Sequence, residues 1–295
     1  MKALIDADMI RYALAFACQK KEEDGTITVA DEGSWKHSVN MFIKSVMKNS
    51  GATGYPSLYL TGKGNFREKI AKKKVYKGSR KEEKPLLYND ITTYLIDSWG
   101  AQVVEGMEAD DAMAIEQTSD RVATWKGAMG LELEEKDALT CRTIICTNDK
   151  DLRMVPGWHY SWPVGEHIGE KEPYFVQGKG EIVPKYHKTK TYKDGSPQLV
   201  RCDCTGYSLF YYQLIVGDSV DNIPGVPRAG PRKAYETLNT LDTELEMYKA
   251  VYELYEEKYP ENALEELLEQ AYLLWMVREL DKEGNPVMWV PPIGE

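Results

Sequence analysis

Lys2-Ala-Leu-Ile-Asp6-Ala-Asp8 opens the chain with a short apolar run that ends on two carboxylates. Such a run is typical of a buried strand, and Asp6 stands where that strand ends. The residues that follow, as far as Cys18, have the composition of a helix. The first 18 residues therefore predict a strand followed by a helix, which is the unit from which parallel sheets are built.

The same alternation continues along the first half of the chain. Short apolar strands are expected at 58–60, 103–104 and 142–146. Helices are expected from Ser34, as the cap of a helix with apolar residues at helical spacing, over 87–99 with Gly100 as its end, and over 109–118. Strands that alternate with helices favour an α/β fold with a mainly parallel central sheet flanked by helices.

The second half has a different organisation. Residues 158–192 are rich in Gly, Pro and Lys and suggest a hairpin excursion, and 207–216 are expected to be helical. The Pro- and Gly-rich stretch 222–232 predicts a turn between helices, and 243–280 predicts two helices that are split at Pro260. We therefore divide the chain into 1–157 with a basic segment at 63–84, a hairpin excursion at 158–204, and a helical region at 205–295 that contains a turn module at 216–238.

Charge is distributed unevenly over the 295 residues. The net charge is −10, but residues 236–281 hold 13 acidic and 3 basic residues, an excess equal to that of the whole chain. Residues 63–84 hold 10 basic and 3 acidic residues. Because a local basic segment sets the attraction for phosphate, the acidic total does not exclude a nucleic-acid partner.

The composition indicates a globular protein of the cytoplasm. Apolar residues make up 42% and charged residues 28%, and no run approaches the roughly 18 apolar residues of a membrane span. Asp6, Asp8 and Arg11 interrupt the N-terminal apolar stretch, unlike a signal peptide. The five scattered cysteines argue against a disulfide framework, and Cys202-x-Cys204 matches no standard zinc spacing.

Four groups of closely spaced acids carry the functional prediction. Three of them follow predicted strands, and the carboxyl ends of parallel strands meet at one edge of a sheet. Crowded carboxylates repel one another, and oxygen ligands suit Mg²⁺ or Mn²⁺, two of which could clamp a phosphodiester. Helix capping is the alternative role, with Asp149 and Asp221 as good candidates. The groups are Asp6-x-Asp8, Glu108-x-Asp110-Asp111, Asp149-x-Asp151 and Asp218-x-x-Asp221.

The order of these motifs resembles the flap endonuclease/5′-nuclease family, a PIN-like fold, and is most similar to the 5′-to-3′ exonucleases of tailed phages. The matching blocks span residues 5–234. They are Leu-Ile-Asp6, Arg67 with Tyr76-Lys77-Gly-Ser-Arg80, Gly106-Met-Glu108-Ala-Asp110-Asp111, Thr147-Asn-Asp149-Lys-Asp151-Leu, and Val216-Gly-Asp218-Ser-Val-Asp221-Asn-Ile-Pro-Gly225-Val.

This resemblance implies a structure-specific 5′-nuclease that hydrolyses DNA with a free 5′ end or flap, in phage DNA replication or host DNA degradation within the host cytoplasm. It leaves open whether RNA in a hybrid is also cut. It implies one divalent ion on Asp6, Glu108, Asp110 and Asp111, and a second on Asp149, Asp151 and Asp218 with Asp221 beside it. It assigns Lys77 and Arg80 in the helical arch to the scissile phosphate.

For DNA binding, the resemblance implies phosphate contact at Arg67 and base stacking at Tyr76. Residues 225–234 are similar to the family's helix–three-turn–helix, which often holds a monovalent cation such as K⁺. The implied contacts there are Gly225, Val226, Arg228, Gly230, Arg232 and Lys233.

Two departures from the family pattern leave alternatives open. No acid stands near Thr61-Gly62, where the family usually has one, and Asp8 is a candidate substitute. Arg228-Ala229 stands where Gly-Ile is common. The alternatives are a phosphatase of the haloacid dehalogenase type with Asp6 as nucleophile, a PIN-type ribonuclease, and a DNA-junction binder without catalysis.

Overall fold

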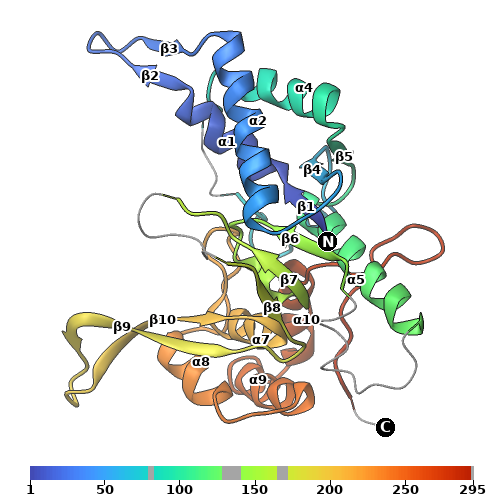
Figure 1. Cartoon of the computed structure of the whole chain (residues 1–295). Coiled ribbons are helices and arrows are strands. Elements are labelled where there is room, and N and C mark those ends of the chain that lie inside the picture. The colour runs from blue at the N-terminus through green and yellow to red at the C-terminus, as the bar shows by residue number, and fades with distance from the viewer. Residues whose placement is uncertain (79–82, 128–140, 165–171, 294–295) are drawn as a thin grey trace. The chain divides into compact units, whose positions relative to one another are not determined.

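The computed structural model describes residues 1–78, 83–127, 141–164 and 172–293 and divides the chain into two compact units (Figure 1). Unit 1 comprises residues 1–65, 81–152 and 157–175, and unit 2 comprises residues 66–80, 153–156 and 176–295. The second unit thus takes in two short segments, 66–80 and 153–156, from the part of the chain expected to be one nuclease region. Each unit is described by itself.

Unit 1 is built on a mainly parallel sheet. Its strands are β1 (Lys2–Asp6), β4 (Ser57–Thr61), β5 (Gln102–Val104), β6 (Thr143–Cys146), β7 (Gly157–Tyr160) and β8 (Tyr174–Val176), in the order β5-β4-β1-β6-β7-β8. β1 lies at the centre, where it pairs in parallel with β4 and with β6; Ile5 lies opposite Leu58 and Cys146. The parallel sheet confirms the predicted fold class.

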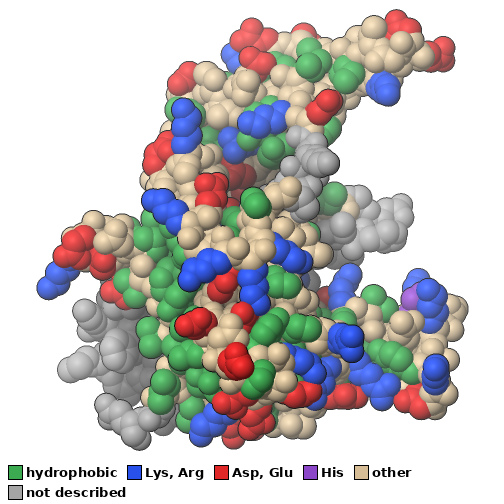
Figure 2. Space-filling view, turned by 180° about the vertical axis from the view of Figure 1, so that it is seen from behind, with side chains coloured by type: hydrophobic (Ala, Val, Ile, Leu, Met, Phe, Trp, Pro, Cys, Tyr) green, Lys and Arg blue, Asp and Glu red, His purple; other side chains and the backbone are tan. Residues whose placement is uncertain are grey.

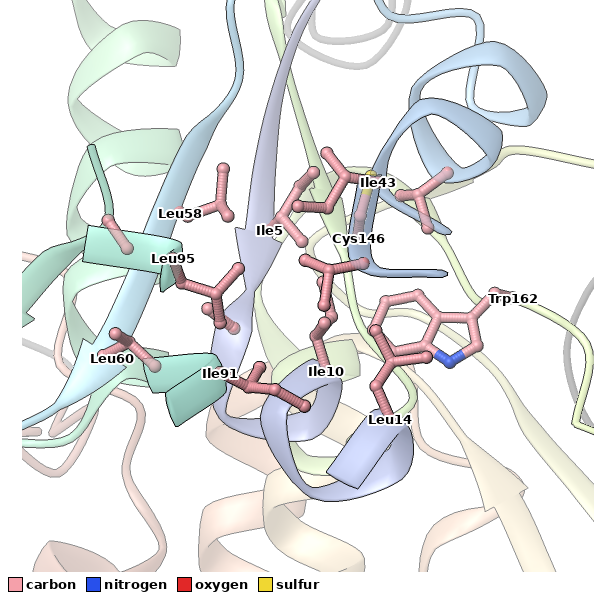
Figure 3. Close-up of a cluster of buried hydrophobic side chains, with 14 of the residues drawn as sticks. Ile5, Ile10, Leu14, Ile43, Leu58, Leu60, Ile91, Leu95, Cys146 and Trp162 are labelled. Atoms are coloured by element: carbon pink, nitrogen blue, oxygen red, sulfur yellow. The ribbon is translucent and has the colours of Figure 1, made fainter. Parts of the chain in front are cut away.

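Helices cover both faces of this sheet. The alternation of strand residues sends Ile5, Leu58 and Cys146 to one face, where they form the main core (Figure 3). α1 (Ala7–Ala17), α2 (Glu32–Asn49) and α4 (Tyr88–Trp99) supply the other side of that core. α5 (Ala109–Gly127) packs against β1, β4 and β6. It lies on the opposite face, where Tyr59 of β4 donates a hydrogen bond to Glu116.

Local sequence explains most helix ends, with one correction. α2 begins at Glu32 and is capped by Asp31, not by Ser34 as expected, because the Asp31 carboxylate accepts a hydrogen bond from the Ser34 backbone N–H at 3.0 Å. α4 ends where predicted, with Gly100 in the left-handed conformation. β2 (Gln19–Lys21) and β3 (Ile27–Val29) form a small antiparallel hairpin between α1 and α2.

Unit 2 is mainly helical. It contains α3 (Phe66–Ile70), α7 (Gly206–Val216), α8 (Pro231–Leu238), α9 (Glu244–Lys258) and α10 (Ala263–Leu274), together with an antiparallel hairpin of β9 (Ile182–Thr191) and β10 (Pro197–Cys204). The excursion expected over 158–204 is therefore narrower than predicted: the hairpin covers 182–204, while 157–160 and 174–176 are strands of the central sheet. Within the described ranges no helix is long and apolar enough to cross a bilayer.

Candidate functional site

Asp6 lies at the carboxyl end of the central strand β1 and is almost fully buried, with 2% of its surface exposed. Its side chain caps α1 by accepting a hydrogen bond from the Met9 backbone N–H at 3.1 Å. It also accepts one from the hydroxyl of Thr147 at 2.8 Å, which ties it to the end of the neighbouring strand β6. Thr147 was not predicted as a functional residue, although its place directly after a strand was a usable signal.

The environment of Asp6 penalises its negative charge. Burial, and after it the charge of Asp8, raises the pKa of the Asp6 carboxyl from 3.8 to about 7. Asp149 raises that pKa further, while the hydrogen bonds from Met9 and Thr147 act in the opposite direction. A buried carboxylate that faces two more is a site where a bound cation removes an electrostatic penalty.

Asp8 lies at the end of strand β4, although it belongs to α1. Its carboxylate accepts from the backbone N–H of Thr61 at 3.1 and 3.2 Å to its two oxygens, and Arg11 pairs with it at 2.6 Å. The Thr61 hydroxyl in turn accepts from the backbone N–H of Ala109, at the start of α5. A carboxylate from α1 thus occupies the strand end that lacks an acid of its own.

The acids at the start of α5 are held by the preceding loops. Glu108 is buried, and one of its carboxylate oxygens accepts from the Asn65 side-chain amide at 3.0 Å. Asp111 is fully buried and accepts from the Glu108 backbone N–H at 3.2 Å, while Asp110 is half-buried. Asn65 is a second residue that sequence reasoning missed.

The loop after β6 holds Asp149 and Asp151. The Asp149 backbone N–H donates to the Thr147 hydroxyl at 2.9 Å, and the Asp149 carboxylate accepts from the Asp151 backbone N–H at 2.8 Å. The short 3₁₀ helix that follows (Asp151–Met154) is thereby capped. Both polar atoms of the neighbouring Asn148 side chain are buried without a hydrogen-bond partner among the described residues. Such a group is expected where water or an ion supplies the missing contact.

The acids of unit 1 share an edge of the sheet without forming a ready metal cage. In the described parts of the chain, no three Asp, Glu, His or Cys side chains are arranged to hold one metal ion together. Asp6, Asp8 and Asp111 instead accept hydrogen bonds from the chain itself. The atoms that could bind a metal ion here are carboxylate oxygens, which suit Mg²⁺ or Mn²⁺. The negative charge of Asp6 also favours a bound cation. A bound ion would share these carboxylates with their present hydrogen-bond donors, because a carboxylate has more lone pairs than these bonds occupy.

In unit 2, Asp218 and Asp221 organise the loop after α7. Asp218 is buried and accepts from the Val220 backbone N–H at 2.8 Å. Asp221 accepts from the Tyr76 hydroxyl at 3.0 Å, and its backbone carbonyl accepts from the Lys77 N–H at 3.1 Å. The Lys77 ammonium lies 3.9 Å from the Asp221 carboxylate. Residues 76–77, which follow α3, and the loop after α7 therefore form one local structure.

Two predicted contact residues, Arg67 and Tyr76, have places that the sequence did not indicate. Arg67 is fully buried, and its guanidinium donates to the carbonyls of Leu273 and Trp275 at 3.1 and 2.6 Å, so it braces α3 against the end of α10. This position does not suit the expected phosphate contact. Tyr76 is buried with its hydroxyl on Asp221, which does not suit base stacking. Arg80 lies outside the described residues.

The turn between α7 and α8 depends on two glycines whose backbones are in close contact. Gly217 has φ 75° and Gly225 has φ 69°. A Cβ on Gly225 would lie 2.4 Å from the Gly217 backbone nitrogen, and one on Gly217 would lie 2.4 Å from the carbonyl oxygen of Ile223. The buried Val226 donates its N–H to Ile215 at 2.8 Å. The backbone of residues 217–226 is thus packed so closely that there is no room for a side chain at Gly217 or Gly225.

Arg228 adopts φ 63°, a conformation that favours glycine, which gives a structural reason for the glycine common at this position in the resembling family. Gly230 precedes α8 without a side-chain cap, and Lys233 is exposed. Arg232 pairs with Asp194 at 3.3 Å and with Glu236 at 2.8 Å, so two carboxylates compensate its charge. Arg228 and Lys233 therefore suit the predicted phosphate contacts better than Arg232 does.

No protein-family model matches the chain, and no curated protein matches it in sequence. Solved structures do resemble it. A zinc-bound 5′-exonuclease of T5 has a TM-score of 0.50 at 15% identity, over 90% of this chain and 88% of that one. A T5 D15 protein co-crystallised with metal ions has a TM-score of 0.49 at 17% identity, over 92% and 90%. A bacteriophage T5 D15 flap endonuclease complex has a TM-score of 0.48 at 16% identity, over 96% and 94%. The chain has a phage 5′-nuclease-like fold.

Proposed function

We propose that the chain is a divalent-metal-dependent nuclease that hydrolyses DNA phosphodiesters at a free 5′ end or flap. The observation that supports this most is the set of acids at one edge of the parallel sheet: Asp6 and Asp8 after β1, Glu108 and Asp111 at the start of α5, and Asp149 after β6. The name of the T5 5′-exonuclease with the similar fold points the same way.

Divalent ions at these acids would supply positive charge to the phosphate oxygens and polarise the attacking water. The chain's own part is to hold the carboxylates. Thr147 and the Met9 N–H orient Asp6, and the Thr61 N–H orients Asp8. Asn65 orients Glu108. No side-chain nucleophile is needed for in-line hydrolysis of a phosphodiester under this scheme, so Asp6 remains a ligand.

Lys77 is the proposed cation for the scissile phosphate, with Arg80 expected beside it. The Lys77 ammonium lies 3.9 Å from the Asp221 carboxylate, which orients the side chain. The roles of Asp218 and of Asp221 as ligands rest on the sequence resemblance alone. A K⁺ site at the turn 225–230 belongs to the same proposal and is tested by replacing K⁺ with a bulky organic cation in binding assays.

A labelled duplex with a 5′ flap tests the proposal, incubated with Mg²⁺ or with EDTA. We expect cleavage only with Mg²⁺, and product length distinguishes exonuclease from flap endonuclease activity. Asp149→Asn should abolish cleavage and leave DNA binding largely intact, because it removes a ligand and preserves the shape of the loop. Turnover by Asp149→Asn in Mg²⁺ that equals that of the natural sequence would refute the role of the acids.

A non-catalytic binder of DNA junctions is the second candidate. One observation favours it: Thr61-Gly62 offers no acid at the end of β4. Such a protein would shift the flap substrate in a gel and leave it uncut in Mg²⁺ and in Mn²⁺. The phosphatase alternative is disfavoured, because Asp6 would have to attack a substrate although it is 2% exposed and accepts two hydrogen bonds.

A further inference from the structure

The β9–β10 hairpin is a basic element in an acidic protein. Residues 182–204 contain five Lys or Arg side chains and two Asp side chains, although the chain as a whole has a net charge of −10. Figure 2 shows Lys and Arg side chains spread along this hairpin, at the right of the view. The proposed hydrolysis uses none of them. An exposed basic surface that catalysis does not need suggests a binding role.

A wide irregularity shapes the hairpin. Tyr186 lies opposite Leu199, but Thr191 lies opposite Pro197, so β9 has three more residues than β10 over this interval. His187 stabilises the extra loop, because its Nδ1 accepts from the backbone N–H groups of Thr189 and Lys190 at 3.2 and 3.1 Å. With Nδ1 as acceptor, the neutral imidazole carries its hydrogen on Nε2, which can donate to an outside group.

The hairpin is attached to the first turn of α8. Arg232 reaches back to Asp194 at the hairpin tip at 3.3 Å, and its guanidinium lies 4.6 Å from the centre of the Tyr192 ring. α8 also packs against both β9 and β10. The hairpin and the start of α8 therefore form one local structure, and Arg232 acts as the brace between them.

A groove of about 670 Å³ lies between the hairpin and the turn before α8. Lys190 and His187 line it from the hairpin, and Arg228 and Lys233 line it from the other wall. Within the described residues, neither Lys190 nor Arg228 takes part in an ion pair. Glu236 also lines the groove, but it pairs with Arg232. The uncompensated charges at the groove are thus positive.

We propose that this groove binds the phosphate backbone of duplex DNA, with Lys190 and His187 of the hairpin adding a second row of contacts to those of the 225–233 turn. The side chains of Lys and Arg and the imidazole N–H can donate hydrogen bonds to phosphate oxygens. Contacts of this kind do not depend on the base sequence of the DNA. The choice of DNA as the polyanion depends on the proposed function. The groove itself extends the binding surface beyond the turn module.

Lys190→Ala tests the groove, with Lys188→Ala as the matched control. Lys188 has the same charge, is exposed and belongs to the same extra loop, but it does not line the groove. Fluorescence anisotropy with a labelled flap duplex in EDTA measures binding without cleavage. We expect Lys190→Ala to weaken binding on the order of tenfold and to reduce the slope of log K against log salt by about 1. Lys188→Ala should change neither quantity.

Equal affinities for the two variants would overturn the inference, as would an effect of Lys190→Ala on binding to anionic vesicles but not to DNA. Circular dichroism and thermal unfolding establish that both variants fold. The outcome is independent of catalysis. If the natural chain never cuts DNA but Lys190→Ala still weakens DNA binding, the groove is a DNA-binding site and the proposed nuclease function is wrong. If the chain cuts DNA and Lys190→Ala binds DNA normally, the nuclease function is supported and the groove is not a DNA-binding site.

Discussion

Replacement of Asp6 by Asn should make the folded chain more stable at neutral and alkaline pH. Asn keeps the shape of the side chain and removes the charge. Its Oδ1 can still accept from the Met9 N–H, while its Nδ2 takes the place of the second carboxylate oxygen and can donate to the Thr147 hydroxyl. Burial and the neighbouring Asp8 raise the pKa of the Asp6 carboxyl from 3.8 to about 7. At about 1.4 kcal/mol for each pH unit between these values, the charged form costs about 4 kcal/mol.

The sign follows from proton binding. Between pH 3.8 and about pH 7 the folded chain holds a proton on Asp6 that the unfolded chain has lost, so the contribution of Asp6 to stability falls as pH rises and is constant above pH 7. Asn carries no such proton. The stability gain of Asp6→Asn should therefore be near zero at pH 4 and approach about 4 kcal/mol at pH 8.

Urea unfolding at pH 4, 6 and 8, in EDTA, measures this difference. Asp97→Asn is the control, because Asp97 lies on the exposed side of α4 and should change stability by less than about 0.5 kcal/mol at any pH. In Mg²⁺ the gain should shrink, since each tenfold excess of a bound ion over its Kd stabilises the natural chain by about 1.4 kcal/mol. The reasoning fails if Asp6→Asn is less stable than the natural chain at pH 8, or if its gain is independent of pH.

Three further predictions concern unit 2. Lys77→Gln should lower turnover on a flap substrate about a hundredfold with little change in DNA affinity; an unchanged rate in single-turnover assays would remove Lys77 from the reaction. Arg228→Gly should stabilise the chain by about 1 kcal/mol in urea unfolding, because φ 63° suits glycine, and should weaken DNA binding, so a loss of stability would contradict the strain argument. Arg67→Ala should cost about 3 kcal/mol of unfolding free energy, because it leaves a cavity and two carbonyls without their donor. The slope of log K against log salt for DNA binding should stay the same. A slope reduced by about 1 would instead show that Arg67 contacts a phosphate.

The sequence was most informative where one local pattern determines the structure. The apolar run before Asp6, the Gly100 helix end and the split at Pro260 each correspond to an observed element boundary. The cap of α2 was misplaced because Asp31 and Ser34 are both good caps, and only the backbone path selects between them. The narrower hairpin has a similar cause: residues 157–160 pair with β6, a contact made across the sheet that no local pattern indicates.

The site was predictable in residue type but not in geometry. Acids after strand ends could be listed from the sequence, since parallel strands end at one edge. The bonds that orient them could not, because Thr147, Thr61 and Asn65 are ordinary residues whose roles depend on long-range contacts. Arg67 shows how a long-range contact escapes a sequence pattern: this cation of the basic segment was assigned to phosphate, and the fold buries it against carbonyls 206 and 208 residues away.

The placement of Asp8 suggests how the site tolerates a missing acid. Asp8 lies in the first turn of α1, and its carboxylate accepts from the Thr61 N–H at the end of β4, where the chain has no acid of its own. The negative charge is then supplied by a neighbouring element, and Arg11 at 2.6 Å partly compensates it. Asp8 is also the charged neighbour that most raises the pKa of Asp6. The residue that brings a carboxylate to the end of β4 thus also raises the cost of leaving the charged form of Asp6 without a cation.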